Sequence, residues 1–196
     1  MPASSTKIRS NLIYLYLCRH GQSQYNARGL LQGQVDNPLT ALGEEQAISL
    51  ALRAKYWNIK QVVSSPLKRA KQTAQLCATA LHLPVDLKKG LEERHFGDWQ
   101  GQALSKLSHY QDFILRCYTD TDLTPSKGAE TTANVRDRMF NQLDTIANQA
   151  QGNVLLISHG DAINCLLSVW KQPIKIANCQ EIRLIKKAGG FVLDTQ

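Results

Sequence analysis

Residues able to handle an anion follow the short apolar runs of this 196-residue chain. Imidazole, guanidinium and carboxylate groups stand where buried strands are expected to end. In an open parallel sheet, ligands bind outside the carboxyl ends of the strands, which meet at one edge. We therefore expect these side chains to lie close together and to form an active site. They are Arg19 and His20 after one apolar run, Arg69 after a second, Glu92 and Glu93 after a third, and His159 after a fourth.

This set of side chains suits the transfer of a phosphoryl group. A neutral imidazole such as His20 is a competent nucleophile, and the reaction otherwise needs positioning and neutralisation of oxygen charge. The forked guanidinium groups of Arg19 and Arg69 can bind phosphate oxygens, and their charge disfavours the imidazolium form of His20. His159, when protonated, would add a further donor. A carboxylic acid can protonate the leaving group, which typically raises the reaction rate by about 10²–10⁴-fold. This chemistry requires neither a metal ion nor an organic cofactor.

Taken singly, each of these residues also has an ordinary structural interpretation. A lone histidine is usually a hydrogen-bonded structural residue, and this is how we interpret His82 and His109. Arg69 alone could be a surface charge, and a glutamate pair could be a solvated face. The shared position at one edge of the sheet is what favours a function.

Hydrophobic patterning predicts alternating strands and helices that position these groups. Continuous apolar runs bounded by turn residues are typical of buried strands, and apolar residues three and four apart indicate helices. Thr40 is the expected N-cap of one helix, and Ser65 with Pro66 is the expected start of another. The expected strands are 12–18, 61–64, 83–87, 153–158, 181–185 and 191–193. The expected helices follow Thr40 and Ser65 and then cover 104–118, 130–150 and 161–170.

This alternation predicts one α/β domain with a mostly parallel sheet over residues 12–196, preceded by a polar tail at 1–11. Residues 119–129 are expected to form a surface loop. The dinucleotide-binding pattern G-x-G-x-x-G and the P-loop pattern G-x-x-x-x-G-K-[ST] are both absent, which disfavours those functions.

Composition excludes several other classes of protein. Hydrophobic residues make up 43% of the chain, far too many for a disordered protein. No run approaches the roughly 20 apolar residues of a membrane helix, and no small-residue cleavage site follows the most apolar run. We therefore expect a cytoplasmic protein with no membrane partner.

Five scattered cysteines predict reduced thiols. A net charge of +7 spread along the chain favours a small anionic substrate over nucleic acid. The oligomeric state is left open, a homodimer included.

Motifs around these residues resemble those of the histidine phosphatase superfamily, which includes phosphoglycerate mutases. The stretch from Cys18 to Asn26, CRHGQSQYN, is similar to the family signature R-H-G-x-S-x-x-N. Each motif alone is weak, but together they keep the family's order and cover nearly the whole chain. The other matching motifs are QG at 32–33, DNPLT at 36–40, SSPLKRA at 64–70, ERHFGDWQG at 93–101, GAET at 128–131 and SHG at 158–160.

The resemblance implies a three-layer α/β/α sandwich and a role for each matching residue. His20 would be the nucleophile that becomes phosphohistidine. Glu93, rather than Glu92, would be the acid and base, because the RHFG of the motif follows it. Asp161 stands where the family often has glycine and adds negative charge near the pocket. The phosphate pocket would comprise Arg19, Arg69 and His159, with Asn26, Gln32, Gly33, Arg94 and Gly160 binding substrate.

Within this family we expect a phosphatase that acts on a small phosphorylated metabolite. Mutases with a similar core carry a longer insertion and a mobile C-terminal tail, whereas here 28 residues (102–129) fill the gap and the chain ends soon after the last hairpin. A mutase must keep water from its phosphoenzyme, commonly with a lid. Hydrolysis is therefore favoured. Mutase-type transfer and a non-catalytic relative that binds phosphorylated ligands stay as alternatives.

Overall fold

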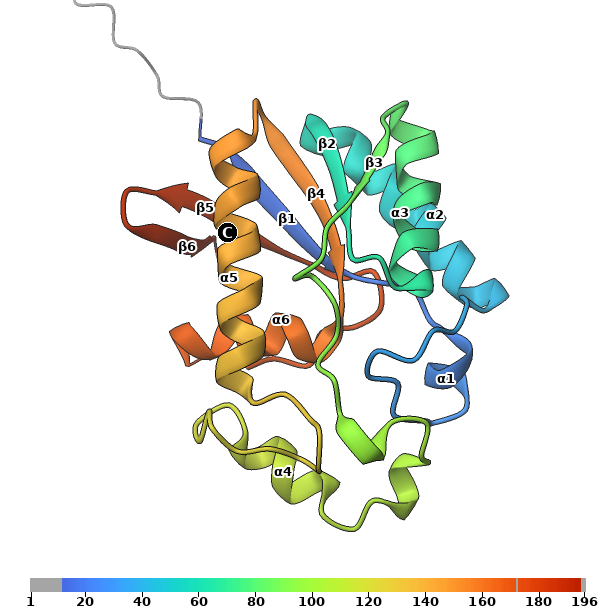
Figure 1. The fold of residues 1–196 in the computed structure, drawn as a ribbon. Helices are drawn as coiled ribbons and strands as arrows, with labels where there is room; N and C mark the ends of the chain where they lie inside the picture. The colour runs from blue at the N-terminus through green and yellow to red at the C-terminus, as the bar shows by residue number, and fades with distance from the viewer. Residues whose placement is uncertain (1–11, 172, 195–196) are drawn as a thin grey trace, which may run out of the picture.

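The structure, a computed structural model, describes residues 12–171 and 173–194 and alternates strands with helices (Figure 1). The predicted α/β fold class is confirmed, and the predicted tail at 1–11 lies outside the described residues. The strands are β1 (Tyr14–Arg19), β2 (Ile59–Ser64), β3 (Val85–Leu87), β4 (Asn153–Ser158), β5 (Glu181–Lys187) and β6 (Gly190–Asp194). The helices are α1 (Gln24–Ala27), α2 (Ala41–Ala54), α3 (Lys68–Leu81), α4 (Tyr110–Arg116), α5 (Thr132–Gln149) and α6 (Gly160–Leu167).

One mixed, mostly parallel sheet organises the described residues, with the strand order β3-β2-β4-β1-β5-β6. Strands β1 and β2 pair in parallel with the two sides of β4, so that Leu156 lies opposite both Leu17 and Val63. Strand β5 runs antiparallel to β1, and β6 runs antiparallel to β5. This topology brings the carboxyl ends of β1, β2 and β4 to a single edge.

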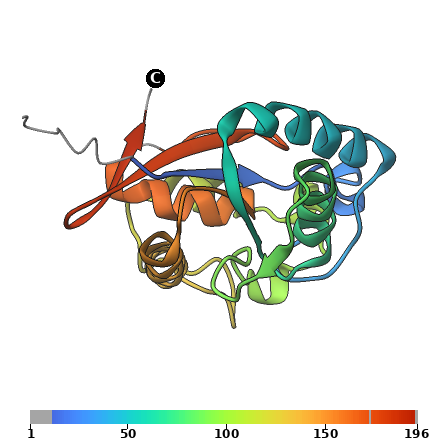
Figure 2. The same cartoon turned by 90° about the horizontal axis from the view of Figure 1, so that it is seen from above.

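Helices cover both faces of the sheet, which makes the three layers visible in Figure 2. Along β1, Leu15 and Leu17 pack with α5 and α6, whereas Tyr16 and Cys18 pack with α2 and α3. Successive side chains of a strand point to opposite faces, so a strand covered on both sides must be apolar throughout. This explains the uninterrupted apolar run of β1 and confirms the sandwich that the resemblance implies.

The two predicted helix starts have different outcomes. Thr40 caps α2 as expected, and its hydroxyl accepts a hydrogen bond from the backbone N–H of Gly43 at 3.0 Å. The prediction that Ser65 caps α3 is wrong, because that helix begins only at Lys68. The Ser65 hydroxyl lies instead 2.8 Å from Nε2 of His159, a contact across the sheet that local sequence does not reveal.

Residues 97–129, called the cap segment below, are built around a third hydrophobic cluster, to which Leu31 and Phe96 also contribute. Phe113 and Cys117 are buried at its centre. The ring of Phe113 stands edge-on to the rings of Phe96 and Trp99, with centroids 6.4 and 5.9 Å apart. Edge-to-face pairs of this kind contribute about 0.5–1.5 kcal/mol beyond area burial. The cap segment is therefore a folded part of the protein.

The two sequence predictions for the cap segment have different outcomes. The helix expected at 104–118 is limited to α4, preceded by a single 3-10 turn at Leu104–Lys106. The surface loop expected at 119–129 is confirmed, since these residues form turns and bends and none is buried. The hydroxyl of Ser126 anchors it by donating to the carbonyl oxygen of Phe96 at 2.7 Å.

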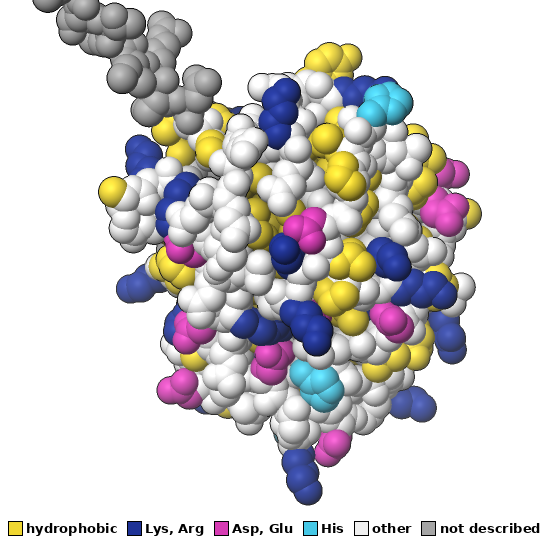
Figure 3. Space-filling model, turned by 45° about the horizontal axis from the view of Figure 1, so that its top comes forward, with side chains coloured by type: hydrophobic (Ala, Val, Ile, Leu, Met, Phe, Trp, Pro, Cys, Tyr) yellow, Lys and Arg dark blue, Asp and Glu magenta, His cyan; other side chains and the backbone are white. Residues whose placement is uncertain are grey.

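The surface carries mixed charge. On the face seen in Figure 3, Lys and Arg side chains are scattered among Asp and Glu. Within the described residues, no helix is long and apolar enough to cross a bilayer. All five cysteines are free and buried, as expected for structural thiols. A cytoplasmic location and a homodimer stay predictions.

The loop after β1 packs backbone against backbone on the first turn of α2. A Cβ atom added to Gly43 would lie 2.0 Å from the carbonyl oxygen of Gln22, and one added to Gly21 would lie 2.3 Å from the carbonyl oxygen of Gly43. Neither distance is tolerated between real atoms. Because Gly21 directly follows His20, this contact fixes where the imidazole stands.

We expect Gly43→Ala to lower the free energy of unfolding by about 1–3 kcal/mol, the usual cost of adding atoms to a well-packed contact. The loss should occur although alanine favours helix more than glycine does. Urea denaturation measures the change. Ser49→Ala, at an exposed position of the same helix, is the control and should shift stability by less than about 0.5 kcal/mol. Equal stability of the two variants would contradict the close contact.

Candidate active site

The structure brings the predicted residues together at the carboxyl edge of the sheet. A cavity of about 570 Å³ opens there. Arg69 and His159 have no exposed surface and lie against His20, with the rings of His20 and His159 5.1 Å apart. The predicted residues that line the cavity are Arg19, His20, Asn26, Gln32, Gly33, Glu93 and Gly160.

His20 is held with one nitrogen free of a proton. Its Nδ1 lies 2.6 Å from the carbonyl oxygen of Gly21, and its Nε2 accepts a 3.1 Å hydrogen bond from Nε of Arg69. A guanidinium group can only donate. Nε2 must therefore be the unprotonated nitrogen, and Nδ1–H donates to Gly21. The nitrogen that faces Arg69 is the one that carries a lone pair.

The surroundings keep this imidazole neutral. Burial, reinforced by the charges of Arg69 and Arg19, lowers the pKa of His20 well below its ordinary value of 6.5. Burial and the nearby Arg69 also lower the pKa of His159 well below that value. A nucleophilic nitrogen needs a free lone pair at the working pH, and the site provides one.

The guanidinium of Arg69 is held by the loop that follows α1. Its two terminal nitrogens donate to the carbonyl oxygens of Gly33 at 2.7 Å and of Val35 at 3.1 Å. Gly33 has a φ of +52°, and a Cβ atom there would lie 2.0 Å from the side-chain oxygen of Gln100, so this position needs glycine. Burial lowers the pKa of Arg69 to about 10, which leaves it charged at neutral pH.

Two buried donors beside His20 have no partner among the described residues. They are Nε of Arg19 and Nδ1 of His159. The hydroxyl of Ser65 lies 2.8 Å from Nε2 of His159 and can donate there, which leaves the imidazole proton on Nδ1. Buried polar groups in folded proteins are nearly always paired. Two unpaired donors next to a charged arginine are suited to the oxygens of an anion such as phosphate.

Amide side chains complete the polar wall. The carbonyl oxygen of Gln32 accepts from the Ser23 hydroxyl at 2.7 Å and from the Asn37 amide at 3.0 Å, so its own amide N–H groups are the part left for a ligand. The carbonyl oxygen of Asn26 accepts from the backbone N–H of Ser23 at 3.2 Å. These bonds confirm that Asn26 and Gln32 are oriented side chains of the cavity wall.

The side chain of Glu93 lies against the first turn of α6, where backbone N–H groups donate to its carboxylate. Oε1 accepts from the N–H groups of Ala162 at 2.8 Å and Arg94 at 3.0 Å, and Oε2 accepts from Asp161 at 3.3 Å. Burial raises the pKa of Glu93, and the neighbouring Asp161 raises it further against the opposing charge of Arg69. A buried carboxyl with a raised pKa is suited to donate a proton near neutral pH.

Arg94 is held by partners within the protein, and its predicted role in binding substrate stays a prediction. Its guanidinium has no exposed surface and lies outside the cavity wall. Nε donates to Asp161 at 2.7 Å and a terminal nitrogen donates to the Thr132 hydroxyl at 2.8 Å. The same Asp161 accepts from the hydroxyl of Tyr118 at 2.6 Å, which ties the cap segment to α6. Arg94 therefore neutralises Asp161 and positions the helix start that holds Glu93.

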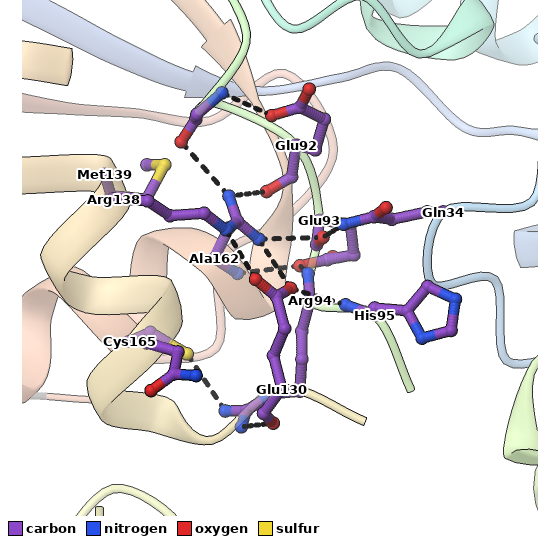
Figure 4. Close-up of polar contacts among 12 residues, drawn as sticks. Gln34, Glu92, Glu93, Arg94, His95, Glu130, Arg138, Met139, Ala162 and Cys165 are labelled. Carbon is purple, nitrogen blue, oxygen red and sulfur yellow. Dashed lines mark hydrogen bonds and ion pairs between the residues drawn. The ribbon is translucent and has the colours of Figure 1, made fainter. Parts of the chain in front are cut away.

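A second guanidinium, that of Arg138 on α5, holds the segment that carries Glu93 (Figure 4). It donates to the carbonyl oxygens of Glu92 and Glu93 at 2.7 and 3.0 Å. It also forms a two-pronged ion pair with Glu130 at 2.8 and 2.9 Å. The sequence gives no sign of this role for Arg138, because nothing in the helical pattern separates it from Arg136 two residues earlier. Only the GAET motif, which contains Glu130, pointed to this region.

No group of three or more His, Cys, Asp or Glu side chains among the described residues could hold a metal ion. Metal-independent chemistry stays a prediction, and the assays below test it.

Comparisons with known proteins agree on one family. A family model described as the histidine phosphatase superfamily (branch 1) matches residues 15–195. A Salmonella choleraesuis protein named "probable phosphoglycerate mutase GpmB" is 31% identical, with 94% of this chain and 92% of that protein covered.

Solved structures of two phosphatases are also similar. A mycobacterial glucosyl-3-phosphoglycerate phosphatase in complex with VO3 has a TM-score of 0.79 and 27% identity, covering 94% of this chain and 98% of that one. A phosphoserine phosphatase from Entamoeba histolytica in complex with phosphoserine has a TM-score of 0.77 and 28% identity, covering 93% and 95%.

The two buried neutral histidines should make the protein sensitive to acid. In the unfolded chain each histidine gains a proton near pH 6.5, whereas the folded pKa values of His20 and His159 lie well below that. The unfolded state therefore binds more protons as the pH falls, so stability is present above 6.5 and is lost below it. Between pH 7.5 and 5.5 we expect each histidine to remove about 1.4 kcal/mol of unfolding free energy.

Urea denaturation of wild type and His20→Asn at these two pH values measures this loss. Between pH 7.5 and 5.5 the free energy of unfolding should fall by about 1.4 kcal/mol less in the variant than in wild type. Ser49→Ala, which keeps both histidines, should follow wild type. Parallel losses in wild type and His20→Asn would mean that the imidazole is not held neutral in the folded protein.

Proposed function

The chain belongs to the histidine phosphatase superfamily, and from this premise we propose that it is a metal-independent phosphomonoester hydrolase acting through a phosphohistidine at His20. The observation that carries the proposal is the unprotonated Nε2 of His20 beside Arg69, with the two unpaired donors of Arg19 and His159 next to it. Glu93 supplies the acid that such a reaction needs.

The first step transfers the phosphoryl group to the protein. The phosphate oxygens accept from Arg19, Arg69 and His159, which neutralises their charge. The Nε2 lone pair of His20 attacks phosphorus and forms the P–N bond as the P–O bond to the alcohol breaks. Protonated Glu93 gives its proton to the departing oxygen. Once Nε2 of His20 is bonded to phosphorus, it can no longer accept the hydrogen bond from Nε–H of Arg69. That N–H can then donate to an oxygen of the transferred phosphoryl group.

The second step returns the protein to its starting state. The carboxylate of Glu93 takes a proton from water, whose oxygen attacks phosphorus. The P–N bond breaks, orthophosphate leaves and His20 regains its lone pair. Nδ1–H of the imidazole keeps its hydrogen bond to Gly21 in both steps, since only Nε2 reacts.

Hydrolysis is favoured over isomerisation by two kinds of observation. The similar solved structures include proteins named as phosphatases. The cavity wall also offers few cations for the carboxylate of a phosphoglycerate: among the described lining residues, Arg19 and Lys175 are the cationic ones. The cap segment does line the cavity, contrary to the expectation that the chain has too little material for a lid. Water exclusion alone therefore does not separate the two activities.

The decisive assay is phosphate release from a panel of phosphomonoesters with excess chelator present. We expect release by wild type and a loss of at least about 10³-fold in His20→Ala, because the nucleophile is removed. The panel includes 3-phosphoglycerate, with 2-phosphoglycerate measured as a second product, because curated relatives are named as mutases.

Each other outcome of this panel has a definite meaning. Isomerisation without phosphate release would make the protein a mutase. Binding of phosphate without turnover of either kind would make it a phospho-ligand-binding relative. Activity that disappears with chelator would contradict the metal-free mechanism.

Glu93→Gln tests the acid role. We expect the variant to lose about 10²–10⁴-fold in kcat/KM on alkyl phosphates, whose alkoxide must be protonated, because kcat/KM reports on the first step alone. The loss should be less than about tenfold on 4-nitrophenyl phosphate, because nitrophenolate leaves with little need of a proton. Glu92→Gln is the matched control, since it makes the same change one residue away and should keep wild-type rates on both substrates. Equal losses on both substrates in Glu93→Gln would contradict the acid role.

A further inference from the structure

The cavity has a polar end and an apolar end. The polar end is the phosphate pocket described above. The apolar part of the wall comes from the cap segment and from the segment after α6, with the side chains of Leu104, Tyr110, Ile114, Leu115 and Ile174. The volume of about 570 Å³ falls within the roughly 300–1,000 Å³ of small-molecule sites, so a ligand much larger than phosphate fits.

Part of this apolar wall is unusually exposed. Leu115 is 80% exposed and Ile174 is 41% exposed, although both line the cavity. In the same helix as Leu115, Phe113 is buried in the cluster of the cap segment, which leaves Tyr110 and Ile114 to face the cavity. Exposed apolar side chains beside a cavity commonly mark a surface that binds an apolar ligand.

The charges of the wall disfavour a second anionic group on the substrate. Beyond the phosphate pocket, the charged lining residues within the described part of the chain are Asp161 and Lys175. Asp161 is already paired with Arg94 and Tyr118. Lys175 is exposed, so its attraction for a substrate carboxylate is weakened by water. A carboxylate in the cavity would lose its hydration and gain little in return.

We infer that the substrate is a small phosphomonoester whose alcohol part is apolar and uncharged, such as an alkyl or aryl group, and that the cap segment binds this part. The inference rests on the proposed function and names its substrate class. The apolar alcohol would lie on Leu104, Tyr110, Ile114 and Leu115 while the phosphate occupies the pocket at His20. Recognition would come from the area that is removed from water.

A series of straight-chain alkyl phosphates from ethyl to hexyl isolates this effect. Their leaving alcohols differ little in basicity, so chain length changes binding and leaves the chemical step alone. We expect kcat/KM to rise about fourfold for each methylene that is fully buried, which is the transfer free energy of about 0.8 kcal/mol expressed as a ratio. Glycerol 3-phosphate and 3-phosphoglycerate complete the panel, and both should be poorer substrates than propyl phosphate.

Two variants locate the effect. Leu115→Asn and Ile114→Asn should each flatten the dependence on chain length, because both replace apolar wall with amide. Leu52→Asn is the matched control: Leu52 is 55% exposed on α2 and does not line the cavity, so the slope should stay that of wild type. Leu115 is so exposed that its substitution should leave folding intact, and thermal unfolding checks this for every variant.

The outcomes separate this inference from the proposed function. Hydrolysis of every alkyl phosphate at the same kcat/KM would overturn the apolar subsite and leave the phosphatase activity standing. A preference for 3-phosphoglycerate over glycerol 3-phosphate that disappears in Lys175→Met would also overturn it, in favour of carboxylate recognition. Failure to hydrolyse any monoester, 4-nitrophenyl phosphate included, would overturn the proposed function itself.

Discussion

A charged guanidinium buried against a neutral imidazole is the constraint on which the rest of this structure depends. Removing an ion such as Arg69 from water costs several kcal/mol, and no carboxylate forms a hydrogen bond to it among the described residues. The carbonyl oxygens of Gly33 and Val35 offset that cost, which requires the loop to follow a path with positive φ at Gly33. On the other side, the Gly21 backbone must stay against α2 so that His20 presents its lone pair to the same guanidinium.

Burial acts on the two reacting groups in opposite directions and thereby makes them complementary. It lowers the pKa of His20 and raises the pKa of Glu93, so both groups favour their neutral forms. The local charges reinforce each shift, since Arg69 and Arg19 act on the imidazole while Asp161 acts on the carboxyl. Arg94, placed behind Asp161, donates a hydrogen bond to its carboxylate at 2.7 Å. A neutral nucleophile and a protonated acid can therefore coexist in one cavity.

Sequence patterns could predict those parts of the fold and site that depend on local rules. Strands β1 and β4 are buried on both faces, so continuous apolar runs identify them, and parallel pairing then places His20 and His159 together. The patterns fail where a distant contact decides. Ser65 has the residue type of an N-cap, but its hydroxyl is used by His159 across the sheet. Arg94 sits in a motif that suggests substrate contact, and only packing against α6 shows that its guanidinium faces Asp161.

The two ends of the cavity have separate structural origins, and this separation bears on how such a protein acquires its specificity. The phosphate pocket is built from strand ends whose positions follow from long-range parallel pairing, and a change there would disturb the sheet. The apolar wall comes mainly from the cap segment, whose cluster around Phe113 is separate from the two clusters that flank the sheet. Leu31 and Phe96 belong both to that cluster and to the cavity wall, so they join the two parts. The wall can therefore change its size and polarity while the chemistry stays intact. This is consistent with similar folds that are named for quite different phosphorylated substrates.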